Sequence, residues 1–389
     1  MKSTSALLHA LSVVTVFLTT LANAPRLRAQ ISVTDVTQLG SLGGGLSTAY
    51  GINASGQVVG SAVDGEGYTH AFLYSGGSMT QLATSGSGNS YAYAINSAGT
   101  TVGEAENSAS DGDLMAASYS GSAITFLGPS GFLTSTAYAV NTAGQVVGTA
   151  LDGDFTNRAF LKNPASAATV LDSTPHQASA AYGINASGVI VGAIHVDGPQ
   201  QHAFLHDGTL RDLGTLGGDS SVATAINDSG MVVGRSNLED GEGLHAFAYS
   251  GSMVDLGTLG GSESAALALN NLGLIVGSSE DASGHEHAFI YRDGVMLDLN
   301  DLAAGYLVDG TSAPGFKVFN AAYGINDAGQ IVGRGEYFDG TDTFVDRAFI
   351  LGTSISAIPE PSTYTVLLGL TTLTLTLARR RRAEGPVSS

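Results

Sequence analysis

Four histidines stand at equivalent places in a repeated His-Ala-Phe triplet, and imidazole serves both metal binding and acid–base catalysis. They are His70, His202, His245 and His287. Two further copies of the triplet carry Arg158 and Arg347 at the same place, and a guanidinium group cannot ligate a metal. Because each histidine belongs to a different copy of one repeat, the fold should hold them apart. We therefore interpret them as packing or turn residues and predict no catalytic or metal-binding residues among them.

Acidic residues in five predicted turns form the second group with possible chemistry, because calcium prefers oxygen ligands. Their spacing matches neither the EF-hand loop nor the Gly-Gly-x-Gly-x-Asp calcium repeat, and Asp-Gly turns form without a metal. The sequence therefore predicts no cofactor, with calcium as the alternative. The five groups are Asp64/Glu66, Asp111/Asp113, Asp152/Asp154, Glu239/Asp240/Glu242 and Asp339/Asp342.

No nucleophile elbow, zinc-protease motif, phosphate loop or dinucleotide fingerprint occurs in a fitting context. The largest irregularity is an insertion around Asp301 to Lys317, which contains Tyr306, Asp309, Pro314 and Phe316. Irregular loops on a rigid repeat scaffold often carry binding sites. An extra turn that bridges two repeats explains the insertion equally well.

The elements that position these residues follow from an internal repeat, Asn-x-x-Gly with a second glycine four residues later. Successive asparagines are 43, 45, 44, 42, 43 and 56 residues apart. Asparagine bonds readily to its own turn backbone and tolerates left-handed conformation, so we interpret it as structural. The seven copies begin at Asn53, Asn96, Asn141, Asn185, Asn227, Asn270 and Asn326.

Each period contains four short β-like runs joined by turns rich in Gly, Asp and Ser. In the fifth copy the runs are 222–227, 231–235, 245–249 and 253–256. Four short strands per 40–45 residues is typical of a β-propeller blade. The sequence thus predicts an all-β fold with one seven-bladed propeller of four-stranded blades, spanning residues 30–355. An open solenoid is the competing architecture.

The ends of the array predict how the ring closes. Several copies finish with a strand such as the run 211–218, but the seventh stops after Ile350. The missing strand appears before the first copy, at residues 37–44. Gly44 precedes Asn53 by nine residues, as Gly218 precedes Asn227. An N-terminal strand that completes the last blade explains this arrangement and removes exposed sheet edges.

Charge restricts the partners. Without residues 1–29 and 362–389 the chain keeps 8 basic and 33 acidic residues, a balance of −25. Such a surface repels nucleic acid and anionic lipid. The absence of cysteine means that burial, not disulfides, must hold the fold together.

The N-terminus, residues 1–29, has the pattern of a secretory signal peptide. Lys2 provides the positive start, and an apolar stretch from Leu7 to Leu21 follows. Small residues favour cleavage after Ala24 or after Ala29. The sequence therefore predicts export through the inner membrane.

The C-terminus, residues 356–389, combines three features in a fixed order. Pro359, Glu360 and Pro361 precede an uncharged stretch at 364–378, and an arginine cluster, Arg379, Arg380, Arg381 and Arg382, follows. The stretch has 15 residues, fewer than the ~20 that a spanning helix needs. This order resembles the PEP-CTERM sorting signal of Gram-negative bacteria. The resemblance implies a short membrane-associated (transmembrane) tail helix, an exosortase as partner, and a biofilm or exopolysaccharide context.

The repeats themselves resemble the HAF-repeat family of extracellular bacterial proteins. The resemblance rests on the His-Ala-Phe triplet, the Asn-x-x-Gly turn and the Asp-Leu-Gly-Thr-Leu-Gly-Gly run, such as 212–218, and covers most of residues 35–351. It implies export but no particular chemistry.

Together these features predict a protein of the cell surface or extracellular matrix. We expect a non-enzymatic glycan- or protein-binding scaffold whose C-terminus an exosortase processes. The alternatives are an extracellular carbohydrate-active enzyme, which paired carboxylates facing one pocket would favour, and a matrix component without a discrete site.

Overall fold

The computed structural model describes residues 29–357, except 85–87, 109–111, 122, 172–176, 197–199, 240, 242, 311–312 and 342. Residues 32–354 form one compact unit. The chain ends belong to a second unit, of which only residues 29–31 and 355–357 are described. Residues 1–28 of the predicted signal peptide and 358–389 of the predicted sorting tail therefore lie outside the described residues.

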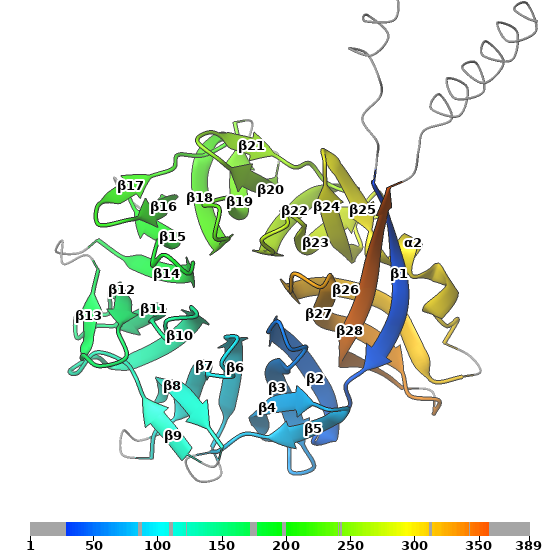
Figure 1. The fold of residues 1–389 in the computed structure, drawn as a ribbon, viewed down its shortest axis with the longest axis horizontal. Helices are drawn as coiled ribbons and strands as arrows, with labels where there is room; N and C mark the ends of the chain where they lie inside the picture. Colours follow the sequence, from blue (N-terminus) through cyan, green and yellow to red (C-terminus); the bar gives the residue numbers. More distant parts are fainter. Residues whose placement is uncertain are drawn as a thin grey trace, which may run out of the picture. The chain divides into compact units, whose positions relative to one another are not determined.

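Seven four-stranded antiparallel sheets stand around one axis like the blades of a propeller (Figure 1). This confirms the predicted fold class. Blades 1 to 3 consist of β2 (Gly43–Ile52), β3 (Val58–Asp64), β4 (Thr69–Ser75) and β5 (Ser78–Gln81); β6 (Ser90–Ile95), β7 (Thr101–Glu106), β8 (Leu114–Ser120) and β9 (Ala123–Phe126); and β10 (Thr134–Val140), β11 (Val146–Leu151), β12 (Asn157–Lys162) and β13 (Ala168–Val170).

Blades 4 to 6 repeat this order. They consist of β14 (Ser179–Ile184), β15 (Ile190–His195), β16 (Gln201–His206) and β17 (Leu210–Asp212); β18 (Gly217–Ile226), β19 (Val232–Leu238), β20 (Leu244–Tyr249) and β21 (Met253–Asp255); and β22 (Gly260–Leu269), β23 (Ile275–Asp281), β24 (Glu286–Arg292) and β25 (Val295–Asp298).

Blade 7 draws its strands from both ends of the chain. Its strands are β26 (Gly315–Ile325), β27 (Gln330–Phe338), β28 (Phe344–Ala357) and, at the outer edge, β1 (Ala29–Gln38). Just after β1, the Leu39 N–H donates to the Ala348 oxygen at 3.0 Å, as Leu213 does to Ala203 at 2.8 Å within blade 4. The N-terminal strand thus closes the ring in the register of an ordinary fourth strand, as predicted.

The second glycine of each repeat is explained by a close contact inside the blade. A Cβ atom placed on Gly60 would overlap the backbone oxygen of Thr48 on the neighbouring inner strand, and it would lie 2.7 Å from the ring of Phe72, its partner on the next strand. Phe72 itself is completely buried. The backbone oxygen therefore excludes a side chain at this glycine, and the phenylalanine of the His-Ala-Phe triplet packs against it. Blade 2 lacks that phenylalanine and has Ala117 opposite Gly103.

The hydrophobic core lies between neighbouring blades. One cluster joins Phe72 and Ala49 of blade 1 to Val332 and Ile350 of blade 7, with Leu39 beside them. An equivalent cluster joins blades 4 and 5. The junction that closes the ring is therefore packed like the others.

Helices are short within the described residues. They are α2 (Leu299–Leu302) and the 3-10 turn η1 (Ala304–Tyr306), both between blades 6 and 7. Neither these nor any other described helix has the length and apolarity to cross a membrane.

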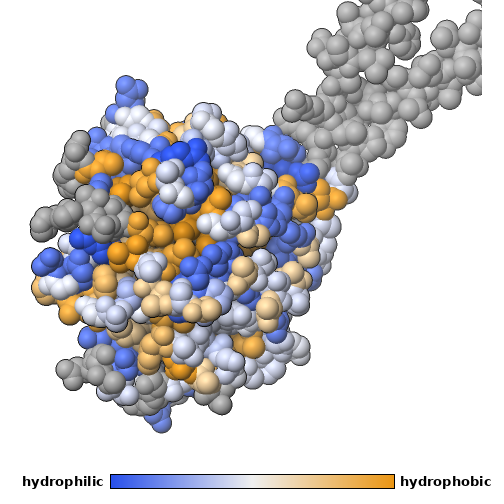
Figure 2. Space-filling model, turned by 60° about the vertical axis from the view of Figure 1, so that its left-hand side comes forward, coloured by the Kyte–Doolittle hydropathy of each residue, from blue (hydrophilic) through white to orange (hydrophobic). Residues whose placement is uncertain are grey.

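Figure 2, turned so that the left side of Figure 1 comes forward, shows hydrophilic residues around a patch of apolar ones on this face of the surface.

Candidate ligand site at the mouth of the central channel

The triplet histidines do not converge on a common site. In blades 4 to 6 the Nδ1 atoms of His202, His245 and His287 lie 2.8, 3.0 and 2.6 Å from the carboxylates of Asp212, Asp255 and Asp298 on the outer strand of the same blade. His70 contacts Asp64 through Nε2 at 2.9 Å. Each histidine therefore joins two segments of its own blade.

The two arginines at the histidine position differ from each other. Arg158 of blade 3 takes the place of a histidine and donates from Nε to Asp152 at 2.9 Å. Arg347 of blade 7 forms no ion pair with any described residue, and its Nε and Nη1 atoms are buried without a hydrogen-bond partner.

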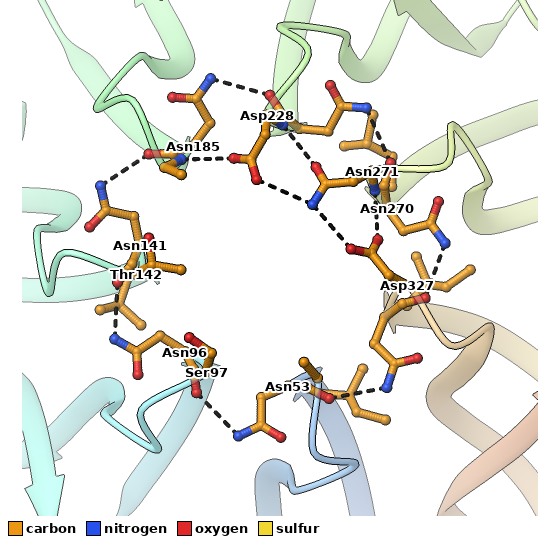
Figure 3. A pocket seen from close by; sticks show the side chains of 18 of the residues that line it. Asn53, Asn96, Ser97, Asn141, Thr142, Asn185, Asp228, Asn270, Asn271 and Asp327 are labelled. Atoms are coloured by element: carbon orange, nitrogen blue, oxygen red, sulfur yellow. Dashed lines mark hydrogen bonds between the residues drawn. The ribbon is translucent and has the colours of Figure 1, made fainter.

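The repeated asparagines do converge, and they form a closed ring of hydrogen bonds around the channel (Figure 3). The Nδ2 group of Asn53 donates to the backbone oxygen of Asn96 in the next blade at 3.1 Å. The same bond recurs at every blade, with lengths between 2.9 and 3.2 Å. The seventh, from Asn326 to the Asn53 oxygen at 3.0 Å, joins the last repeat to the first.

The other half of each asparagine side chain holds its own turn. The Asn53 Oδ1 atom accepts the N–H groups of Ser55 and Gln57, both at 3.0 Å. The left-handed backbone conformation occurs at the glycine three residues later, where Gly56 has φ = 75°, and not at the asparagine. The Asn-x-x-Gly motif therefore combines a turn with a link between blades.

A second link between blades comes from a serine six residues before the asparagine. In blade 4 the Oγ atom of Ser179, buried within the structure, accepts the Ala159 N–H of blade 3 at 3.0 Å. Six of the seven copies have this serine, and blade 7 has Asn320, whose Oδ1 atom is buried without a partner. Its constant distance from the asparagine is the signal in the sequence that could have predicted this link.

The acidic turns considered for calcium use their carboxylates to hold the turn. Asp152 Oδ1 accepts the N–H groups of Asp154 and Thr156, at 3.0 and 2.9 Å. The Thr156 N–H and the Arg158 side chain lower the pKa of Asp152. Asp64 and Asp339 make equivalent turns. No group of three possible metal ligands occurs among the described residues, which leave out Asp111, Asp240, Glu242 and Asp342.

The insertion between blades 6 and 7 contacts both the core and the closing strand. Phe316 is buried with its ring centroid 5.1 Å from that of Phe319. Asn300 bonds the backbone of Phe319 through both of its side-chain atoms. Tyr306 donates its hydroxyl to the Thr34 oxygen of β1 at 2.7 Å. These contacts favour the bridging interpretation of the insertion over the binding-loop interpretation.

The ring of asparagines surrounds a cavity of about 310 Å³. Each blade contributes its asparagine, the apolar residue before it and the residue after it. The residue after the asparagine is exposed and differs between blades, so it breaks the sevenfold symmetry. These seven residues, which we call the mouth residues, are Ala54, Ser97, Thr142, Ala186, Asp228, Asn271 and Asp327.

Two carboxylates face this one cavity. The Nδ2 group of Asn271 donates to Oδ2 of Asp228 and to Oδ2 of Asp327, both at 3.2 Å (Figure 3). Asp228 and Asp327 were not predicted as site residues, because they lie 99 residues apart and only the packing of blades 5, 6 and 7 brings both to Asn271. Both are exposed, and amide groups satisfy their oxygens.

A row of tyrosines lies on the inner strands, each three residues before the asparagine of its blade. The ring centroids of Tyr50 and Tyr93 are 5.3 Å apart, and those of Tyr138 and Tyr182 are 5.1 Å apart. Burial raises the pKa of Tyr138 to about 12, and burial together with the Glu104 carboxylate raises that of Tyr93. The raised pKa values keep the phenols of Tyr93 and Tyr138 protonated and neutral at physiological pH.

The residues of the predicted sorting signal, Pro359 to Pro361 and Arg379 to Arg382, lie outside the described residues.

Comparison with known proteins supports the fold alone. No protein-family model matches the chain, and no curated protein matches it in sequence. Among solved structures, a puromycin-hydrolyzing peptidase of Mycobacterium tuberculosis is similar with a TM-score of 0.52 and 13% identity, over 82% of this chain and 56% of that one. TolB from Acinetobacter baumannii has a TM-score of 0.40 and 15% identity, over 63% of this chain and 61% of TolB. The chain thus spans less than two thirds of either protein.

Proposed function

We propose that this chain is an exported, non-enzymatic binding protein of the bacterial envelope, related to the HAF-repeat proteins, whose propeller holds a glycan at its mouth. The proposal rests on a difference between the repeated polar residues, which are bonded to each other, and the mouth residues, which vary from blade to blade. The repeated polar residues are engaged within or between blades, as Asn53 is with Asn96 and His202 with Asp212. The mouth residues vary and line a concave cavity that combines apolar side chains with a few polar groups, as small-ligand sites do.

The mouth suits a small polar ligand better than a protein surface. Its cavity of about 310 Å³ is at the lower end of the range of ligand pockets, about 300–1,000 Å³. Amide and carboxylate groups there resemble those with which proteins bind sugar hydroxyls.

Binding to the exopolysaccharide of the producing cells tests this function. We expect the purified full chain to bind it, and the double variant Asp228→Ala, Asp327→Ala to bind much more weakly. Replacing Asp207 and Asp293, exposed carboxylates outside the cavity, provides the matched control. Equal binding by the double variant and the wild type would contradict a site at the mouth.

The sorting part of the proposal rests on the order Pro-Glu-Pro, uncharged stretch and arginine cluster. An exosortase would recognise this tail at the inner membrane and release the propeller to the surface or matrix. Fractionation of cells with and without their exosortase tests it, because the protein should reach the matrix only in the former. Retention in the inner membrane in both strains would refute it.

A carbohydrate-active enzyme is the second candidate, since Asp228 and Asp327 face one cavity and glycosidases act with two carboxyl groups. One of the pair must then hold a proton, whereas amide N–H groups surround both here. Release of reducing ends from the bound polysaccharide, lost in Asp228→Asn, would favour the enzyme over the binding protein.

A further inference from the structure

The backbone N–H groups of the mouth residues fall into two sets. Three of them are capped by the side chain of the mouth residue in the following blade. The Ala186 N–H donates to Asp228 Oδ1 at 2.9 Å, the Asp228 N–H to Asn271 Oδ1 at 3.0 Å, and the Asn271 N–H to Asp327 Oδ1 at 2.8 Å. The protein therefore shows what these N–H groups bind, namely an oxygen atom lying inside the mouth.

The other four N–H groups belong to Asp327, Ala54, Ser97 and Thr142, on the consecutive blades 7, 1, 2 and 3. In each case the mouth residue of the following blade is alanine, serine or threonine, too short to reach back. No described residue accepts a hydrogen bond from any of the four. We call these four N–H groups the donor arc.

The opposite side of the mouth offers acceptors. Asp228 and Asp327, with Asn271 between them, present carboxylate and amide oxygens from blades 5 to 7. We call these three side chains the acceptor arc. No lysine or arginine lines the cavity, so no basic side chain of the lining offsets the two carboxylates. In Figure 3, Ser97 and Thr142 lie across the channel from Asn271 and Asp327.

Building on the proposed function, we propose that the mouth binds a neutral sugar residue in one orientation. Hydroxyl oxygens of the sugar accept hydrogen bonds from the donor arc, while hydroxyl hydrogens are donated to Asp228 and Asp327. A hydroxyl group both donates and accepts, so a sugar ring satisfies both arcs at once. The hydroxyl groups of Ser97 and Thr142 lie beside the donor arc and add to its polar edge.

Charge selects against acidic sugars. A uronate carboxylate would find N–H donors in the donor arc, but it would face two fixed carboxylates. The segment between the predicted signal peptide and tail also carries a balance of −25, so an anionic polysaccharide is repelled at long range as well. A neutral residue meets neither penalty.

Substitutions that cap the donor arc from within test the proposal. Ser97→Asp places a carboxylate where it can accept the Ala54 N–H, and Thr142→Asp does the same for the Ser97 N–H, copying Asp228 and Ala186. Ser97→Asn caps the same N–H without adding charge. Ala98→Asp, in the same exposed turn but outside the cavity, is the matched charge control.

The measurement is calorimetric titration of the full chain with neutral oligosaccharides of glucose, galactose and mannose, and with oligo-uronates. We expect a neutral oligosaccharide to bind best. Ser97→Asp, Thr142→Asp and Ser97→Asn should each weaken it by about tenfold, the effect of one or two lost hydrogen bonds. Ala98→Asp should leave it unchanged, and all variants should keep the melting temperature of the wild type.

Tighter binding of uronates than of neutral sugars would overturn the ligand class. Equal affinity of Ser97→Asn and wild type would overturn the role of the donor arc. In both cases binding at the mouth still depends on Asp228 and Asp327, so the proposed function survives. Binding that is indifferent to the acceptor arc as well refutes the function and this inference together.

Discussion

Replacing one asparagine of the ring should destabilise the whole propeller. Asn141 is 4% exposed and makes four side-chain hydrogen bonds. Its Oδ1 atom accepts the N–H groups of Ala143 and Gln145, and its Nδ2 group donates to Gln145 Oε1 and to the Asn185 oxygen of blade 4. Asn141→Ala removes all four and opens the ring at the junction between blades 3 and 4.

The magnitude follows from the number of bonds. Each contributes about 1 kcal/mol net, so the free energy of unfolding should fall by about 4 kcal/mol. That is a large fraction of the ~5–15 kcal/mol that stabilises a typical domain. Asn141→Asp keeps the Oδ1 acceptor but turns the donor into an acceptor that faces the Asn185 oxygen. We expect a loss of about 2–3 kcal/mol for this variant, because only the donated bonds disappear.

Urea unfolding followed by circular dichroism measures both losses. Thr142→Ala, the exposed neighbour whose side chain makes no hydrogen bond to a described residue, should change the free energy of unfolding by less than about 0.5 kcal/mol. A loss below about 1 kcal/mol for Asn141→Ala would show that the ring of asparagines contributes little.

Three further predictions concern other parts of the propeller. Asn320→Ser should raise the free energy of unfolding by up to about 1 kcal/mol in urea titrations, because it removes a buried unpartnered oxygen and restores the serine link of the other blades; a loss of stability would contradict it. Phe316→Ala should cost about 3–5 kcal/mol as a cavity in the aromatic cluster of blade 7, whereas Tyr306→Phe should cost less than about 1.5 kcal/mol, and equal costs would argue against a buried bridge. The lowered pKa of Asp152 makes its contribution complete above its unfolded value of 3.8 and lost as pH falls through the folded value, so melting scans below about pH 4 should show a smaller acid loss for Asp152→Asn than for wild type.

The sequence was sufficient for the architecture because the repeat carries its constraints within each copy. Gly60 must leave room for the backbone oxygen of Thr48, and the turn at Asn53 needs Gly56 three residues later, so the period stays constant. The strand before the first copy was recognisable because it repeats the run that follows the triplet elsewhere. Leu39 consequently lies where the closing register requires it.

The contacts between copies were harder to predict. Ser179 bonds to the preceding blade and Asn141 to the following one, and neither partner is near in sequence. The mouth residues were missed for the same reason. Nothing in the sequence around Asp228 or Asp327 shows that both will face one cavity, since their approach depends on how blades 5, 6 and 7 pack around the axis.

A crystal structure of the chain with a bound neutral oligosaccharide is the most direct test of binding at the mouth. We expect one sugar residue in the mouth, with its hydroxyl oxygens within about 3 Å of the Ala54, Ser97 and Thr142 N–H groups. Its hydroxyl hydrogens should point toward Asp228 and Asp327. A sugar bound between two blades or on the outer rim, with the mouth free of it, would show that the mouth is not the binding site.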